Sequence, residues 1–273
     1  MTRESGRMRR IIVAFLIGAG ALAWHGAGLA TDADLETRLI LAPSGALRAG
    51  LYPGTPTSIL PNAGSGEPRG VGHDLGKELA RRLGVPYEPV VFAKNADVLA
   101  AVKNGEIDVA FTNATAVRAR DMDFGPHFLE IELGCLVSRE STLTTPAEMD
   151  SPGLRIGVTA GSSTDATLSR DFKHSEIVRA ATFDVAIEML SAGAIHAYAT
   201  NKATLFEMAE KLPGSKVLDG RWGIERHAIA IPKGREQAIA FIRQFTNEMK
   251  SEGVIGAAIA RAGLRGATTS PAE

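Results

Sequence analysis

Two short segments carry side chains that could hold an anionic group. Arg118 follows the apolar segment 107–111, and its guanidinium can form a bidentate pair with a carboxylate, which a lysine cannot. Ser162 and Ser163 follow a glycine and precede a predicted helix, where free backbone N–H groups and a hydroxyl can bind an anion. Each segment also has a plainer interpretation, because Arg118 could be a surface arginine beside Arg120 and a serine could cap the helix.

Three further residues are candidate ligand contacts. Asn113 and Thr115 flank the end of the predicted strand that precedes Arg118, and both could offer polar contacts. Tyr52 ends the first predicted strand, where it could cover a ligand or be a partly buried strand aromatic. These candidates form a binding set, since the sequence shows no nucleophilic triad, metal cluster or phosphate loop. We therefore predict no catalytic residue, no metal and no cofactor.

The elements that position these residues alternate between strand and helix, which predicts an α/β fold with mostly parallel sheets. Apolar residues at helical spacing predict a helix over 71–83, ended by Gly84. The apolar segment 107–111 predicts a central strand. A mobile leader is expected over 31–46. Further strands are predicted at 47–52, 87–92, 131–137, 155–158, 176–180, 195–199 and 227–231, and further helices at 97–103, 162–170, 183–190, 201–211 and 235–250.

Composition narrows the class of protein. The 273 residues are 45% hydrophobic with a formal net charge of −1, so nothing favours binding to nucleic acid or to an anionic membrane surface. Aromatic residues make up only 5%, which disfavours a large aromatic pocket. The single cysteine, Cys135, lies in an apolar run and is predicted to be a small buried hydrophobic residue.

The first thirty residues have the order of a secretory signal peptide. A start with four arginines precedes an apolar run over 11–24, and small residues at Gly28 and Ala30 suit a cleavage site. The run is short for a membrane span, although an uncleaved N-terminal anchor is the alternative. We predict a cleaved signal peptide over 1–30 and a periplasmic location.

Several segments together resemble the family-3 extracellular solute-binding proteins, the polar amino-acid type of ABC-transporter receptor. The resemblance covers roughly residues 47–262 and depends on the order and spacing of its segments. Arg118 lies six residues before Phe124, as the family spacing requires. The segments are 70–75 (GVGHDL), 102–108 (VKNGEID), 115–118 with 122–126 (TAVR and MDFGP), 156–163 (IGVTAGSS) and 190–197 (LSAGAIHA).

The resemblance implies a two-lobed periplasmic-binding-protein fold of type II. Each lobe is expected to be a mixed sheet flanked by helices, with the ligand cleft between the lobes. Lobe 1 is predicted to be discontinuous, over 31–137 and 226–265, and lobe 2 to cover 138–225. The chain is expected to cross near 137–139 and near 223–227, and a disordered tail is predicted over 266–273.

The function that follows is capture of a small polar, carboxylate-bearing solute and its delivery to the membrane permease of an ABC importer, by a monomer. The resemblance places Arg118 and Ser163 on the ligand. It also points to Asn201, where the family has an aspartate for the ligand ammonium, so a solute without a compulsory amine fits better. Asp165 could replace that acid but is expected to be an exposed helix residue, and His196 is expected to be structural.

Two other classes of function are open. One is a periplasmic dehydratase resembling cyclohexadienyl dehydratase, which would need an acid or base with a perturbed pKa in the cleft. Glu130 and Glu132 lie near the crossing, but they could equally form a solvated face. The other is an accessory module that binds a protein partner. Since the chemistry of the site decides between classes that share a fold, we expect a binding protein and not an enzyme.

Overall fold

Strands and helices alternate along residues 33–61 and 66–271, which are the residues that the computed structural model describes. The strands are β1 (Leu47–Leu51), β2 (Tyr87–Val91), β3 (Val109–Asn113), β4 (Met122–Val137), β5 (Arg155–Thr159), β6 (Glu176–Ala180), β7 (Ala197–Asn201), β8 (Lys216–Val217), β9 (Gly223–Pro232) and β10 (Ala267–Thr269). The α-helices are α1 (Leu35–Leu41), α2 (Val71–Leu83), α3 (Asn95–Lys103), α4 (Ser163–Asp171), α5 (Phe183–Ser191), α6 (Lys202–Lys211), α7 (Ile239–Ser251) and α8 (Val254–Ala262), and 3-10 turns form η1 (Arg118–Arg120), η2 (Pro146–Met149) and η3 (Glu236–Ala238).

The two long strands β4 and β9 connect the two halves of the sheet. The strand order is β2-β1-β3-β9-β4-β7-β5-β6, and β8 and β10 also pair with β4. The β2-β1-β3 and β7-β5-β6 groups are parallel, whereas β4 and β9 pair antiparallel with each other and with their neighbours. Each half is therefore a mixed sheet, as the sequence predicts.

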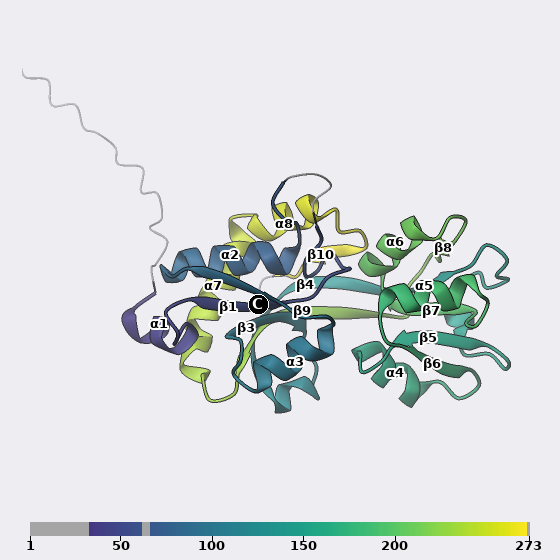
Figure 1. The fold of residues 1–273 in the computed structure, drawn as a ribbon, viewed down its shortest axis with the longest axis horizontal. Helices are drawn as coiled ribbons and strands as arrows, with labels where there is room; N and C mark the ends of the chain where they lie inside the picture. Colours follow the sequence, from purple (N-terminus) through teal and green to yellow (C-terminus); the bar gives the residue numbers. More distant parts are fainter. Residues whose placement is uncertain (1–32, 62–65, 272–273) are drawn as a thin grey trace, which may run out of the picture. The chain divides into compact units, whose positions relative to one another are not determined.

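Each half of the sheet has its own hydrophobic core, and this makes the fold two-lobed. In one half, β1 and β3 pack with α2, α7 and α8 (Figure 1). In the other half, β5 to β7 pack with α4, α5 and α6. Within β4, Ile131 belongs to the first core and Cys135 to the second. We call these halves the first and second lobes; the residue boundaries predicted for them remain a prediction.

Local patterns explain why these segments form their elements. Val71, Leu75, Leu79 and Leu83 recur every four residues and are all buried, so α2 presents one apolar stripe to the sheet. Gly84 ends that helix in the left-handed region, at a φ of 68°, which glycine adopts without strain. The strand β3 is buried over four successive residues, as expected of a central strand, although it is parallel only to β1 and antiparallel to β9.

Two terminal predictions were wrong. The expected mobile leader contains α1, whose first turn is capped by Asp34 and whose last residue, Leu41, is fully buried in the first core. The expected disordered tail contains β10, which pairs antiparallel with residues 129–131 of β4. In both cases a short segment of low sequence signal is held by tertiary contacts. The predicted signal peptide, 1–30, lies outside the described residues, and none of the described helices is long and apolar enough to cross a membrane.

Candidate functional site

A cavity of about 540 Å³ lies where the two lobes face each other, and it gathers most of the predicted ligand contacts. The first lobe contributes the ends of β1 and β3 and the η1 turn, and the second lobe contributes the start of α4 and the end of β7. The predicted residues that line it are Tyr52, Asn113, Arg118, Ser162, Ser163 and Asn201.

Arg118 is held at this cavity by the turn that follows β3. Its backbone N–H donates to Thr115 Oγ1 over 3.2 Å, and its Nη1 donates to Thr112 Oγ1 over 2.7 Å and to the Asn113 carbonyl over 3.0 Å. A guanidinium has five N–H donors, and these two bonds fix the group through Nη1 alone. Burial lowers the pKa of Arg118, and the nearby Glu225 carboxylate opposes that effect.

The two serines at the start of α4 have different partners. Ser162 is the N-cap, and its hydroxyl accepts a 3.0 Å hydrogen bond from the Asp165 N–H, which confirms the capping interpretation. Ser163 donates its hydroxyl to Glu225 Oε1 over 2.7 Å. The Gly161 N–H donates a 3.0 Å hydrogen bond to the Asp165 carboxylate. Part of the predicted anion site is therefore occupied by carboxylates of the protein itself.

Glu225 on β9 is the residue that the sequence analysis missed. Its side chain is only 8% exposed, and it lines the same cavity. Oε1 accepts from Ser163 and, over 3.5 Å, from Asn113 Nδ2; Oε2 accepts from Asn201 Nδ2 over 3.3 Å and contacts His227 Nε2 over 3.3 Å. Three of the predicted ligand contacts thus converge on one carboxylate.

The charge state of Glu225 follows from these contacts. Burial alone would raise the pKa of the carboxyl group, but the contact with His227, the Ser163 hydroxyl and the Arg118 charge together outweigh burial. The pKa of Glu225 is therefore below its ordinary value, and the side chain is a carboxylate at neutral pH. Its only sequence signal is an acid two residues before the apolar run 227–231, in a segment expected to join the lobes.

Asn201 and Tyr52 each combine a structural contact with a place at the cavity. Asn201 caps α6, because its Oδ1 accepts a 3.0 Å bond from the Thr204 N–H while its Nδ2 faces Glu225. Tyr52 packs against the core beside α3 and also lines the cavity, so both of its interpretations fit. Burial raises the pKa of its phenol to about 12.

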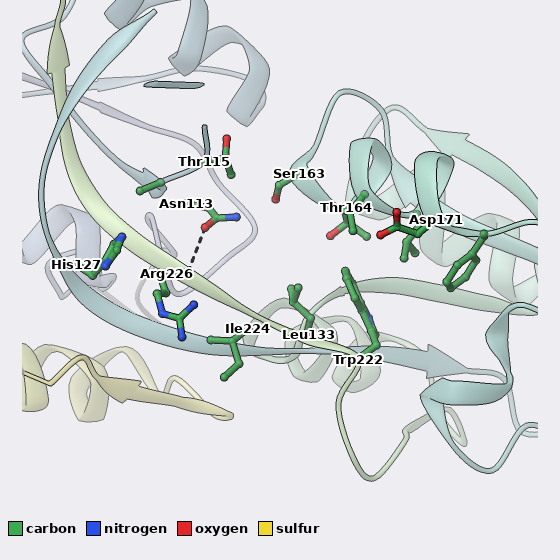
Figure 2. A pocket seen from close by; sticks show the side chains of 15 residues that line it. Asn113, Thr115, His127, Leu133, Ser163, Thr164, Asp171, Trp222, Ile224 and Arg226 are labelled. Atoms are coloured by element: carbon green, nitrogen blue, oxygen red, sulfur yellow. Dashed lines mark hydrogen bonds between the residues drawn. The ribbon is translucent and has the colours of Figure 1, made fainter. Parts of the chain in front are cut away.

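Thr115 is the predicted contact that does not line this cavity. It lies instead at a second cavity of about 560 Å³, with His127, Asp171 and Trp222. Figure 2 shows Thr115 and Asn113 at one side of this second cavity and Asp171 at the other. The connection of Thr115 to the first cavity is indirect, through its hydrogen bond to the Arg118 backbone.

Charged side chains surround the first cavity and pair with one another. Arg69 lies 3.8 Å from Glu207, and Lys211 lies 3.0 Å from Asp184. Lys94 also lines the cavity, and its side chain is about half exposed. The Lys211–Asp184 pair is exposed and contributes little binding energy, whereas the Arg69–Glu207 pair is partly buried. Of the two charges in the interior, Glu225 is buried and Arg118 is partly buried.

Other residues considered in the sequence have structural roles. Asp165 is buried, not exposed as expected, and pairs with Arg179 at 2.9 Å. His196 accepts a 2.9 Å bond from the Arg155 N–H. Cys135 is fully buried in the second core, as predicted. Glu130 and Glu132 pair with Arg226 and with Lys202 and Arg221, respectively, on a partly solvated face. Among the described residues, no group of three His, Cys, Asp or Glu side chains could hold a metal ion.

Comparison with known proteins gives a family and a fold. Residues 47–262 match the profile of the bacterial extracellular solute-binding proteins, family 3. The solute receptor for L-cysteine of Neisseria gonorrhoeae is similar, with a TM-score of 0.71 and 23% identity over 81% of this chain and 90% of that one. The arginine-bound form of truncated ArgBP from T. maritima gives a TM-score of 0.67 and 24% identity over 78% of this chain and 99% of that one.

A third solved structure has a similar fold. The ancestral amino acid-binding protein AncCDT-1, a precursor of cyclohexadienyl dehydratase, gives a TM-score of 0.68 and 20% identity over 80% of this chain and 95% of that one. At such identities these likenesses show a shared fold. No curated protein matches the chain.

Proposed function

We propose that this chain, which belongs to family 3 of the bacterial extracellular solute-binding proteins, captures a small polar, carboxylate-bearing solute between its lobes and delivers it to an ABC-type importer. The observation that carries the proposal is Arg118. Its guanidinium is partly buried, is held by hydrogen bonds to Thr112 Oγ1 and the Asn113 carbonyl, and lines the cavity. A carboxylate of the solute would pair with its remaining N–H donors.

The two lobes give the capture step its mechanism. Arg118 comes from the first lobe, whereas Ser163 and Asn201 come from the second, so a bound solute completes contacts that neither lobe makes alone. A ligand that binds the closed arrangement better than the open one shifts the population toward closure. We propose crossings at 137–139 and 223–227 and lobes over 31–137 with 226–265 and over 138–225.

The same proposal includes export of the chain to the periplasm and a membrane permease as its partner. A cleaved signal peptide over 1–30 would release the chain into the periplasm, where a monomer with a closed cleft meets the permease. The family description, extracellular solute binding, supports this location. The L-cysteine receptor and the arginine-bound ArgBP support an amino-acid-like solute.

A dehydratase is the second candidate, because the AncCDT-1 structure is described as a precursor of such an enzyme. The ionised state of Glu225 speaks against a proton donor at that position. Incubation of the protein with prephenate and arogenate, followed by product detection, separates the two functions. Turnover would overturn the binding-only proposal. Purification with a periplasmic protein and without any small solute would favour an accessory module instead.

The decisive experiment identifies the solute directly. Protein purified without refolding is denatured, and the released small molecules are identified by mass spectrometry. Calorimetry with the identified compound then compares Arg118→Ala with Arg120→Ala, a matched control because Arg120 lies exposed in the same η1 turn. We expect the first variant to bind at least about a hundredfold more weakly, as a buried bidentate pair requires, and the second to bind normally. Equal affinity of Arg118→Ala and the unmodified protein would refute the carboxylate assignment.

A further inference from the structure

We propose that residues 265–271 form a strap that holds the second lobe against the first and stabilises the closed cavity before any solute binds. This inference goes beyond the proposed function, because it concerns the two lobes themselves and applies to any solute. The strap contains β10, which lies beside β4 (Figure 1). It begins after Ala262, the last residue that matches the family profile, so the family match does not include it.

The strap is anchored to the first lobe. Its strand β10 pairs antiparallel with residues 129–131 of β4, a part of that strand that belongs to the first core. The Ser270 N–H donates a 3.1 Å hydrogen bond to the Phe128 carbonyl. Lys250 on α7 donates a 2.8 Å hydrogen bond from Nζ to the Pro271 carbonyl. Because these contacts all lie within the first lobe, the strap moves with that lobe.

The first two residues of the strap contact α6 of the second lobe. The Arg265 guanidinium lies over the Phe206 ring, with Cζ 4.4 Å from the ring centre, and its Nη2 lies 2.6 Å from Glu210 Oε1. At Gly266 an added Cβ would lie 2.8 Å from the Lys202 Cβ, so the backbone of the strap lies directly against the helix. Lys202, Phe206 and Glu210 are four residues apart, and they therefore lie on one side of α6.

The helix α6 also borders the cavity, so opening the cavity would move this helix away from the first lobe. Glu207 and Lys211 line the cavity from α6. On the same helix, Thr204 Oγ1 lies 3.0 Å from Thr55 Oγ1, and both threonines are buried. Glu207 lies 3.8 Å from Arg69 of the first lobe. None of these contacts includes a solute, so the closed arrangement has a stabilisation of its own, to which the strap adds.

The strap biases the lobes toward closure and does not lock them. The side chains of Arg265 and Glu210 are 47% and 65% exposed, so their ion pair alone contributes little. The contact with the Phe206 ring adds to it. A modest bias has a measurable effect, because the apparent dissociation constant varies inversely with the fraction of molecules in the binding-competent arrangement. The strap therefore contributes to the affinity of the cavity for any solute.

The experiment measures the separation of the lobes in protein that holds no solute. Spin labels are attached to Val91→Cys in the first lobe and to Val185→Cys in the second, because both valines are exposed and neither lines the cavity. Cys135 is buried and stays unlabelled. Solute is removed by unfolding and refolding, and mass spectrometry of a denatured sample checks its absence. Pulsed electron spin resonance then gives the distances between the labels.

Two arginine variants are compared in this labelled protein. Arg265→Ala removes both contacts of the Arg265 side chain with α6. Arg261→Ala is the matched control, because Arg261 is an exposed arginine of α8 whose ion pair with Asp74 lies within the first lobe. Circular dichroism checks that both variants fold.

We expect two distance populations in the labelled protein with an intact strap, the shorter one belonging to the closed arrangement. The ratio of closed to open molecules should fall by roughly three- to tenfold in Arg265→Ala and stay constant in Arg261→Ala. An unchanged ratio in Arg265→Ala, an equal fall in both variants, or a solute-free protein without a closed population overturns the strap. Each of these results leaves carboxylate binding at Arg118 untouched, so failure of the strap is distinct from failure of the proposed function.

A second variant tests the same contact from the other lobe. Phe206→Leu keeps an apolar side chain on α6 and removes the ring that Arg265 covers. It should lower the closed fraction by itself, and Arg265→Ala should then have a smaller effect than it has in the presence of the ring. Fully additive effects of the two substitutions would show that this contact does not join the lobes, and the inference would fail.

Discussion

The Ser163 hydroxyl donates a 2.7 Å hydrogen bond to Oε1 of Glu225, and this bond joins the start of α4 in the second lobe to the connecting strand β9. Both residues lie between the two lobes, Ser163 and Glu225 each lining the cavity. The bond therefore couples the orientation of the second lobe to the buried carboxylate on β9.

Ser163→Ala should destabilise the folded protein, because it removes the hydrogen bond from the serine hydroxyl to the buried Glu225 carboxylate. Removal of the hydroxyl leaves Oε1 with only the 3.5 Å contact from Asn113, and an under-bonded buried acceptor costs about 1–3 kcal/mol. Urea denaturation at pH 7 measures this loss. In the Glu225→Gln background the same serine substitution should cost less, since the charged acceptor is gone; an equal cost in both backgrounds would show that the bond does not contribute.

The same variant has a predicted pH dependence. The pKa of Glu225 in the folded protein is below its ordinary value of 4.5, so the ionised carboxylate contributes stability above about that pH, and the contribution is lost as the pH falls through the folded pKa. Ser163→Ala removes one cause of the shift and moves the pKa of Glu225 upward. The stability difference between the two proteins should be fully present at pH 7 and should narrow below pH 4.5; a difference that grows on acidification would contradict the assignment.

Arg118→Lys tests whether geometry or charge matters at the carboxylate position. A lysine keeps the positive charge but cannot make the planar two-point pair. It also cannot reproduce the simultaneous bonds to Thr112 and the Asn113 carbonyl together with a ligand. We expect binding of the identified solute to weaken at least about tenfold in Arg118→Lys. Arg120→Lys is the control and should bind with unchanged affinity. Full affinity in Arg118→Lys would reduce the role of Arg118 to a point charge.

The sequence was sufficient for the elements of the fold that depend on local patterns. The helix over 71–83 was predicted to the residue, because its apolar stripe and its terminal glycine are both local signals. The ends of the chain were not predictable in this way. The strand β10 has three small residues, and its existence depends on backbone pairing with β4, which is distant in sequence.

The candidate site was predictable only in part, for the same reason. Arg118 and Ser163 were found because each lies at the end of a recognisable element. Glu225 lies within a strand. Its place in the site depends on hydrogen bonds from Asn113, Ser163 and Asn201, which belong to three other elements. In the sequence, Glu225 is an acid between an isoleucine and an arginine. The side chains that surround it come from distant segments, so no local pattern marks it.

Gly70 and Gly256 form a matched pair for a test of backbone geometry beside the cavity. Gly70 precedes α2 with a φ of 153°, and a Cβ at this position would overlap the backbone carbonyl oxygen of Ser58. Gly256 lies exposed in α8, where an added methyl group would meet open space. Gly70→Ala should cost more than about 1 kcal/mol, whereas Gly256→Ala should gain about 0.5–1 kcal/mol, as an unstrained helix interior predicts.

Thermal and urea denaturation of the two glycine variants provide the measurement. A stable Gly70→Ala protein would show that the loop before α2 can move away from Ser58. Because Leu60 and Arg69 of this loop line the cavity, solute affinity should fall together with stability in Gly70→Ala and stay constant in Gly256→Ala.

Cys135 should be inert toward thiol reagents in the folded protein. Its side chain is fully buried among the apolar residues of the second core, and burial raises the pKa of the thiol to about 12. Since the thiolate is the reactive form, both access and ionisation oppose modification. Ellman's reagent at pH 8 should react rapidly with the thiol only after urea unfolds the protein. Any slow reaction without urea should be limited by the rate at which the second core opens. Rapid reaction of folded protein would mean that β4 and β7 separate around Cys135, whose backbone pairs with Ala199, and would contradict a stable second core.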